Sequence, residues 1–315
     1  LADYRLLLPV GLTVESLSPF STMCKELPDV TPILGKHSFL SISIDELFVL
    51  KRCLPTMGVL AHYLEVRQAV AGMKGVLLFD EFDHLGAYIK QNRFDQTLEE
   101  HRAKDRPNKI VWDGMSAIVD RHFGEEDWEK RPVPSQVFPK EVAELLAALD
   151  RTRAPGWLAS ESTIRSYGEE GRNDLAGMLE SCRMTLDDHP GRYFQFVGNP
   201  SLFIWLQRSG VLLNEKTCMA KASAAALAAK AADMVAILAF ADVKQGYISA
   251  YRFVVEVPVT RTLENTNIFE DADRMLARQI PVVQRVQEVA PARPPGRNQP
   301  CWCGSSRKFK KCHGR

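Results

Sequence analysis

The sequence predicts an α+β fold, in which a helix-rich body with an antiparallel sheet is followed by a small C-terminal knuckle. Three observations support this fold class. Residues 139–153 place apolar side chains at helical spacing behind a proline, which is typical of an amphipathic helix. Two β-rich runs flank Gly198-Asn199-Pro200, a hairpin pattern. Three of the seven cysteines lie in residues 301–315, a segment too short to build a hydrophobic core.

Residues 1–105 are predicted to form an N-terminal strand and helix domain. The alternating run Phe39–Ile44 predicts a strand. Ser43 with Glu46 three positions later fits a capping box, which predicts a helix from there to about Cys53. A second helix is expected over residues 57–71. A short apolar run after Gly75 leads into a third helix, whose buried side is expected to carry these residues: Phe82, Leu85 and Ile89.

A charged, proline-broken stretch follows. It begins near residue 95, and we assign residues 106–138 to a surface linker because of Pro107, Pro132 and Pro134. One short helix is expected inside it, near residues 110–123.

Residues 139–289 are predicted to form the α+β domain. After the helix at its start come a helix over 172–187, the hairpin, an alanine-rich helix over 214–242 and a last strand over Tyr247–Val259. Helix, hairpin, helix and strand together favour an antiparallel sheet beside helices. The most apolar run, Met219–Val243, is interrupted by charged residues, so we expect a buried helix rather than a membrane span.

Composition excludes several classes of protein. The chain has 315 residues, a net charge of +1, 45% hydrophobic and 25% charged residues, as in ordinary globular proteins. A net charge so close to zero predicts neither a polyanion binder nor a membrane-surface protein. Four cysteines stand alone among apolar residues, which indicates reduced thiols and a cytoplasmic protein: Cys24, Cys53, Cys182 and Cys218. Because the sequence opens without methionine, it leaves open whether a catalytic domain precedes Leu1.

The C-terminal tail carries the clearest chemical pattern. Residues 290–296 form a proline-rich linker, and residues 297–315 contain the spacing Cys301-x-Cys303-x8-Cys312-His313. Three thiolates and one imidazole are a common tetrahedral set for structural zinc. Binding the metal would supply on the order of 10 kcal/mol or more toward ordering so short a segment. A disulfide framework would leave one thiol over, so we predict Zn²⁺.

The tail closely resembles the SEC-C motif, the zinc-binding end of the SecA preprotein translocase. The residues that carry the resemblance are Gly296-Arg297-Asn298, Pro300-Cys301, Cys303-Gly304-Ser305, the basic run Arg307–Lys311 and Cys312-His313-Gly314. Gln299 and Trp302 depart from the usual Asp and Pro, but neither is a ligand position. The resemblance implies zinc at Cys301, Cys303, Cys312 and His313, and a bacterial cytosolic setting. In SecA this tail docks proteins and helps to contact ribosomes or lipid.

Positive charge and aromatic rings surround these ligands. The tail has no acidic residue, and zinc binding does not require its excess of cations. The knuckle could serve only to cap the chain end. Against that interpretation, basic and aromatic side chains on an exposed knuckle favour a protein partner or RNA. The predicted partner-binding residues are Trp302, Arg307, Lys308, Phe309, Lys310 and Lys311.

The body offers weaker indications. The run Val76–Glu81 imitates a Walker B strand, but the chain contains no P-loop sequence, so Asp80 is better explained as a helix cap. Asp80 and His84 share a helical face, and a metal or acid–base cluster could include the neighbouring acidic and histidine residues: Glu81, Asp83, His62 and Glu65. The competing interpretation is a solvated, charged helix face.

Two function hypotheses follow. The first is a cytoplasmic zinc protein whose tail docks a protein or an RNA-containing partner. The alternative is a nuclease-type enzyme that acts on RNA or DNA, with phage defence as one setting. Residues 41–89 loosely resemble large bacterial SEC-C proteins, some of which carry a restriction-endonuclease-like domain upstream. The only D-x-K sequence, Asp242-Val243-Lys244, is expected at a helix end and has no acidic partner close upstream. The sequence identifies no catalytic residue and leaves open whether the protein is an enzyme.

Overall fold

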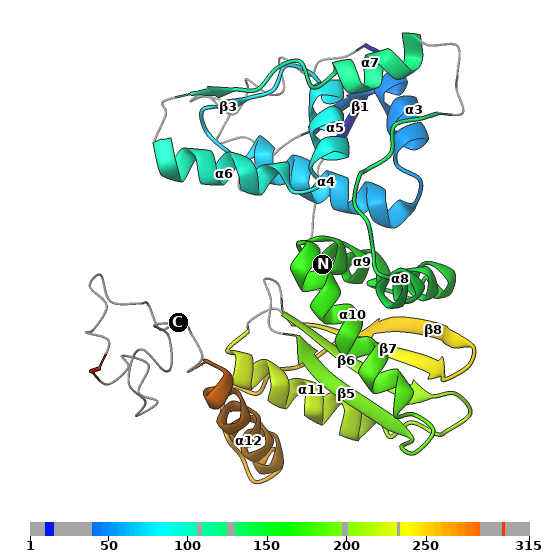
Figure 1. Cartoon of the computed structure of the whole chain (residues 1–315), viewed down its shortest axis with the longest axis vertical. Helices are drawn as coiled ribbons and strands as arrows, with labels where there is room; N and C mark the ends of the chain where they lie inside the picture. Colours follow the sequence, from blue (N-terminus) through cyan, green and yellow to red (C-terminus); the bar gives the residue numbers. More distant parts are fainter. Residues whose placement is uncertain are drawn as a thin grey trace. The chain divides into compact units, whose positions relative to one another are not determined.

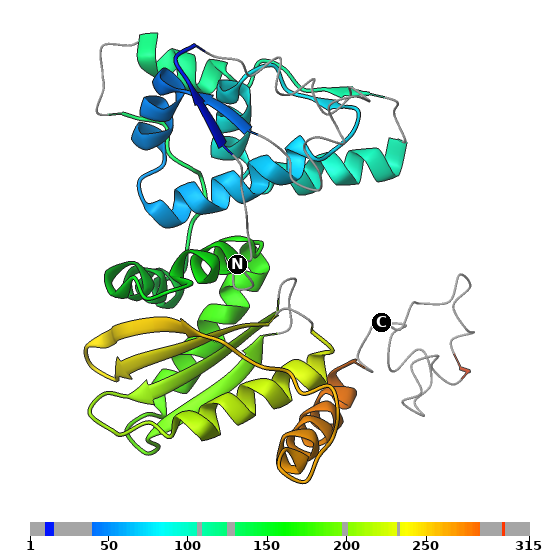
Figure 2. The same ribbon diagram turned by 180° about the vertical axis from the view of Figure 1, so that it is seen from behind.

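The computed structural model describes residues 10–15, 40–105, 109–124, 130–196, 201–231, 234–283 and 298–299. Within them lie ten helices and eight strands, which confirms the α+β class (Figures 1 and 2). The chain divides into two compact units. The first comprises Leu1–Cys218 with Asp233–Val255, and the second comprises Met219–Ala232 with Glu256–Arg315.

The first unit begins with a helical lobe, residues 40–124. Its elements, with the strand that precedes it, are β1 (Val10–Thr13), β2 (Leu40–Ser43), α3 (Ile44–Cys53), α4 (Met57–Ala71), β3 (Val76–Leu77), α5 (Glu81–Lys90), α6 (Phe94–Asp105), β4 (Ile110–Val111) and α7 (Ala117–Gly124). The strands form two parallel pairs, β1 with β2 and β3 with β4. The helices bury a shared apolar core that includes Tyr63, Leu85, Tyr88, Phe94 and Val119.

Capping side chains fix where these helices begin. The predicted capping box is confirmed, because the Ser43 hydroxyl accepts from the Glu46 amide and the Glu46 carboxylate accepts from the Ser43 amide. At the start of α4 the Thr56 hydroxyl accepts from the Val59 amide, a single cap bond. Gly86 of α5 has a packing role, because a Cβ there would lie 2.0 Å from the Met115 carbonyl oxygen. Only a residue without a side chain lets this turn approach the segment before α7.

The described residues between 95 and 135 form more helices and strands than the sequence suggested. Helix α6 buries Phe94 and Leu98, one helical turn apart, and α7 buries Val119 in the same core. Strand β4 pairs with β3. These few apolar residues stand among many charged ones, so the sequence pattern did not indicate that they are buried. The linker predicted over 106–138 therefore contains elements of the helical lobe, β4 and α7. The domain boundaries themselves stay a prediction.

Residues 130–139, the connecting segment, link the helical lobe to the rest of the first unit. The Ser135 amide donates to the Ile89 carbonyl at 3.0 Å, and the Gln136 side chain donates to the Arg165 carbonyl at 2.6 Å. Farther along, the Phe138 ring is contacted by the guanidinium groups of Arg165 and Arg172 at 5.2 and 5.3 Å. These contacts hold the segment in one extended path between helices.

The sheet lobe, residues 140–218 and 234–255, completes the first unit. Its elements are α8 (Lys140–Thr152), α9 (Trp157–Arg165), α10 (Glu169–Met184), β5 (Gly191–Phe196), β6 (Ser201–Arg208), the start of α11 (Glu215–Ala229), β7 (Met234–Asp242) and β8 (Gly246–Phe253). Helices α8, α9 and α10 pack side chains such as Leu145, Ile164 and Leu175 against one face of the four-stranded sheet. Helix α9 also approaches α4, where the Ser162 hydroxyl donates to the Glu65 carboxylate at 2.5 Å.

The sheet is mixed, which corrects the prediction of an antiparallel one. Its order is β5-β6-β7-β8, and the central pair β6 and β7 is parallel. The single helix predicted over 214–242 was wrong, because α11 ends at Ala229 and β7 follows. A short apolar run buried on both faces looks the same in sequence whether it is helix or strand. A strand, a helix and a strand in succession then allow parallel pairing.

The second unit contains the rest of α11 and helix α12 (Thr266–Val283), which was not predicted. Ala224 and Ala228 pack against Ala272, with a contribution from Ile268. Lys221 forms an ion pair with Asp271 across the two helices. Among the described helices, none combines the length and apolar character that a bilayer crossing requires.

Candidate functional site

The acidic start of α5 was the leading candidate in the body. Asp80 is its N-cap, as predicted: the Asp80 Oδ1 accepts from the Asp83 amide at 2.8 Å. Burial raises the pKa of this carboxyl, while the hydrogen bond from the Asp83 amide acts in the opposite direction. Asp80 would be the first acidic residue of a Walker B strand, but its carboxylate caps α5 instead, which argues against that interpretation of Val76–Glu81.

Glu81 lies wholly inside the helical lobe. Its side chain is 0% exposed, and its Oε2 accepts from the Arg67 Nε at 3.0 Å. Its Oε1 accepts from the Tyr63 hydroxyl. Burial, reinforced by the Glu81 charge, raises the pKa of Tyr63 well above its usual value. The three side chains form a buried cluster that neutralises its own charge, which is the condition for keeping a carboxylate out of water.

His62 occupies a second buried position. Its Nδ1 lies 2.7 Å from the Tyr88 hydroxyl oxygen, and its Nε2 has no hydrogen-bond partner among the described residues. Burial, with smaller effects from Arg93 and Arg165, lowers the pKa of His62 to about 3. The imidazole is therefore neutral at physiological pH. A neutral, enclosed histidine supports packing rather than proton exchange with solvent.

Asp83 and His84 are also buried, so the prediction of a solvated charged face on α5 was wrong. Asp83 is 3% exposed, and its Oδ1 accepts from the Ser116 amide at 2.8 Å, which joins α5 to the start of α7. His84 is 1% exposed and lies beside Phe94. The helix turns its acidic first turn inward because each carboxylate finds a donor there.

The predicted metal or acid–base cluster does not form. Each acidic side chain in this region serves a different partner, with Glu65 directed to Ser162. Within the described ranges, no group of three or more His, Cys, Asp or Glu residues is arranged to hold a metal ion. The arrangement suits packing within the lobe, since His62, Glu81, Asp83 and His84 are buried, and only Asp80 and Glu65 are partly exposed.

The D-x-K sequence lies at the end of β7, not at the helix end that we expected. The Asp242 Oδ1 accepts from the amides of Lys244 and Gln245 at 2.7 and 2.9 Å, and these bonds lower the pKa of Asp242. The carboxylate is thus committed to the turn into β8. Metal-dependent nuclease chemistry needs a cluster of ligands around the ion, and within the described residues no group of three or more His, Cys, Asp or Glu is arranged to hold one.

The described body cysteines have no reactive character. Cys53, Cys182 and Cys218 are free thiols, which confirms that part of the prediction, while Cys24 lies outside the described residues. Burial raises the pKa of Cys53 to about 11 and that of Cys218 to about 12, and it raises the pKa of Cys182 as well. A protonated, enclosed thiol is a poor nucleophile.

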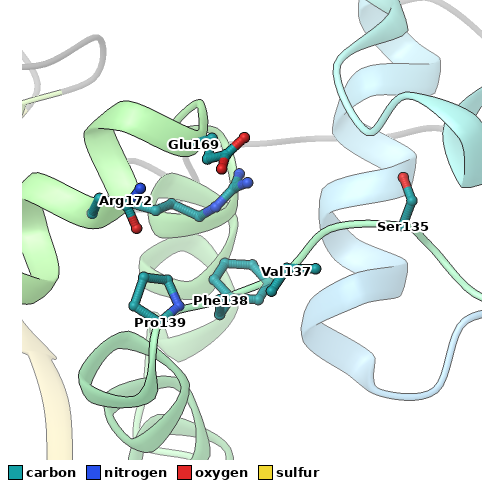
Figure 3. A pocket seen from close by; sticks show the side chains of 7 residues that line it. Ser135, Val137, Phe138, Pro139, Glu169 and Arg172 are labelled. Atoms are coloured by element: carbon teal, nitrogen blue, oxygen red, sulfur yellow. The ribbon is translucent and has the colours of Figure 1, made fainter.

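A pocket of about 340 Å³ lies where the connecting segment passes the start of α10 (Figure 3). Its lining residues are Ser135, Val137, Phe138, Pro139, Glu169, Arg172 and Asn173. The Arg172 Nη1 donates to the Tyr167 carbonyl at 2.6 Å, and its guanidinium stacks on Phe138. Burial lowers the pKa of Arg172, while the Glu169 carboxylate acts in the opposite direction.

Sequence reasoning missed this pocket and the partners of Glu81. Arg67, Tyr63 and Glu81 come from two helices, so no local spacing joins them. Glu169 and Arg172 carried a local signal, because residues three apart share a helical face. The segment was predicted as a helix from 172, three residues after α10 begins.

The C-terminal tail contains the donor set that is predicted to bind zinc. Every predicted zinc ligand and partner-binding residue there lies outside the described residues. Residues 297–315 match the family model described as SEC-C motif. Comparison with curated proteins and with solved structures gives no match. The donor set of three thiols and one imidazole fits a tetrahedral zinc site, so the residues present suit the metal that such motifs often bind.

Proposed function

We propose that this protein binds Zn²⁺ through Cys301, Cys303, Cys312 and His313, and that the ordered tail docks a protein partner. The SEC-C motif at residues 297–315 carries the proposal. Zinc would supply the folding free energy that so short a segment lacks. The tail's own residues would then make the contacts.

The surplus of positive charge favours docking over a purely structural knuckle. Three thiolates around Zn²⁺ leave a net charge near −1, which is smaller than the charge of the surrounding cations. Trp302 and Phe309 add aromatic surface among them. Aromatic and arginine side chains are enriched at interface centres, and basic charge selects an acidic partner surface.

The test separates metal binding from docking. Replacing Arg307, Lys308, Lys310 and Lys311 together by glutamine leaves the ligands intact, so we expect one zinc per chain by elemental analysis. Capture of the specific partner, measured by crosslinking and mass spectrometry against the unaltered chain, should be lost. Ribonuclease treatment before capture distinguishes a direct protein contact from one bridged by RNA.

Cys301→Ser is the complementary variant, because it removes a ligand and keeps every cation. We expect loss of zinc and of capture together. Capture that persists in both variants would show that the tail does not dock. The described body gives no observation that favours the nuclease alternative, and a full-length gene product inert toward DNA and RNA panels with Mg²⁺ would count further against it.

A further inference from the structure

We propose that the pocket beside α10 binds a small zwitterion with an apolar side chain, such as a free aliphatic α-amino acid. The site is independent of the zinc tail. It combines one cation, one anion and an apolar wall within about 340 Å³. Small-molecule sites commonly range from about 300 to 1,000 Å³, mostly apolar with a few placed polar groups.

Arg172 is held ready to receive a carboxylate. Its Nη1 bond to the Tyr167 carbonyl and its stacking on Phe138 fix the plane of the guanidinium. A guanidinium has five N–H donors, and the bond to the Tyr167 carbonyl uses one of them. The Nε is buried without a partner among the described residues, so a ligand carboxylate would meet the terminal nitrogens. A preorganised fork with donors to spare is the side chain best suited to a carboxylate.

Glu169 supplies the opposite charge. It precedes Arg172 by three residues, so both extend from the same side of α10 (Figure 3). Their charges interact, yet the ion pairs formed by the described residues do not include one between them. A ligand that carries both a carboxylate and an ammonium group can satisfy both side chains at once, whereas a simple anion would face repulsion from Glu169.

The remaining wall accounts for the apolar side chain. Val137, Phe138 and Pro139 line one side of the pocket, and Val137 is 76% exposed. An aliphatic group placed there would remove this surface from water. These three residues belong to the connecting segment, so a ligand would also join that segment to α10.

The test uses the full chain and three probes, with affinity measured by isothermal titration calorimetry. L-leucine carries both charges, 4-methylvalerate lacks the ammonium group, and 3-methylbutylamine lacks the carboxylate. We expect L-leucine to bind about tenfold more tightly than either analogue, since each lost charge-assisted hydrogen bond costs about one order of magnitude. Equal affinity for all three, or no saturable binding of L-leucine, would overturn the proposal.

Two variants locate the site. Glu169→Gln should weaken L-leucine binding about tenfold, because the ammonium group loses its carboxylate partner. It should not weaken 4-methylvalerate, which has no ammonium group and is instead relieved of the repulsion from Glu169. Glu170→Gln, a change of the next residue in the same turn, is the matched control and should alter neither affinity. If Glu169→Gln weakens both ligands equally or neither, the ammonium group is not bound at Glu169 and the proposal fails. Within the part of the chain that the structure describes, neither the Glu169 nor the Glu170 side chain forms a hydrogen bond.

Discussion

At the scale of single residues, burial governs which charges the helical lobe tolerates. Glu81 and Arg67 are 0% and 2% exposed, and each would be costly alone. Together with the Tyr63 hydroxyl they satisfy one another. The cluster therefore adds little net stability, but it makes each member strongly dependent on the other two.

This dependence predicts non-additive mutations. Glu81→Ala leaves the Arg67 guanidinium buried and unpaired, so we expect a loss of about 3–5 kcal/mol in the free energy of unfolding. The triple variant Tyr63→Phe, Arg67→Met and Glu81→Leu should recover most of that loss, because no polar group remains to be paired. Urea denaturation measures both.

Lys140→Gln is the control for this experiment. It breaks an ion pair with Glu144 in which the lysine is 80% exposed, so a change within about 0.5 kcal/mol is expected. A Glu81→Ala variant as mild as this control would mean that water reaches Arg67.

His62 gives the helical lobe a defined response to acid. Its pKa is about 3 in the fold against an ordinary value of 6.5, so below pH 6.5 the unfolded chain takes up a proton that the native chain excludes. Stability from this residue is complete above pH 6.5 and is lost as the pH falls toward 3, with a slope of at most about 1.4 kcal/mol per pH unit. His62→Gln should flatten that slope.

The comparison is made from unfolding free energies measured across that pH range. His189, which is exposed, provides the control: His189→Gln should keep the slope of the unaltered chain. Parallel curves for the His62→Gln variant and the unaltered chain would show that His62 is hydrated in solution.

At the scale of elements, the end of α11 explains the largest error of the sequence prediction. The Ala231 amide donates to the Ala226 carbonyl and the Lys230 amide to the Leu227 carbonyl, the two bonds of a Schellman motif. Lys230 occupies the left-handed position with φ of 51°. Glycine is the usual residue at this position after a helix, so a lysine did not indicate that the helix ends there. The apolar run beyond it was therefore assigned to the helix.

The same position predicts a stabilising mutation. Lys230→Gly relieves the strain of a left-handed non-glycine residue, so we expect a gain of about 0.5–1 kcal/mol in unfolding free energy. Arg153, with φ of 48° at the end of α8, is the contrast. Arg153→Gly should gain less, because it loses the bonds to Asp150 and the contact with Trp157. Thermal denaturation of both variants tests the difference, and an equal gain would contradict it.

At the scale of the whole molecule, the sequence predicted what local chemistry decides. Ser43, Glu46 and Asp80 fixed helix starts through their own caps, and these predictions are confirmed. The parallel pairing of β6 with β7 and the inward turn of the acidic residues on α5 depend on which distant partners meet. Contacts between residues far apart in the sequence leave no pattern in local spacing, so the sequence analysis did not predict these two features.

The same distinction between local and distant contacts separates the tail from the body. The cores of the described elements draw on residues 42–275, and zinc would fold its knuckle through contacts among residues 301–313 alone. Removing residues 296–315, or adding a chelator, should therefore leave the main thermal unfolding transition within about 2 °C of the unaltered chain, since a change under 0.5 kcal/mol shifts it no further. Cys301→Ser should lose the zinc, whereas Cys182→Ser, a change of a half-buried body thiol, should retain one zinc per chain. A transition lowered by several degrees after chelation would show that the body depends on the metal, and the tail would then be part of the fold rather than an independent docking element.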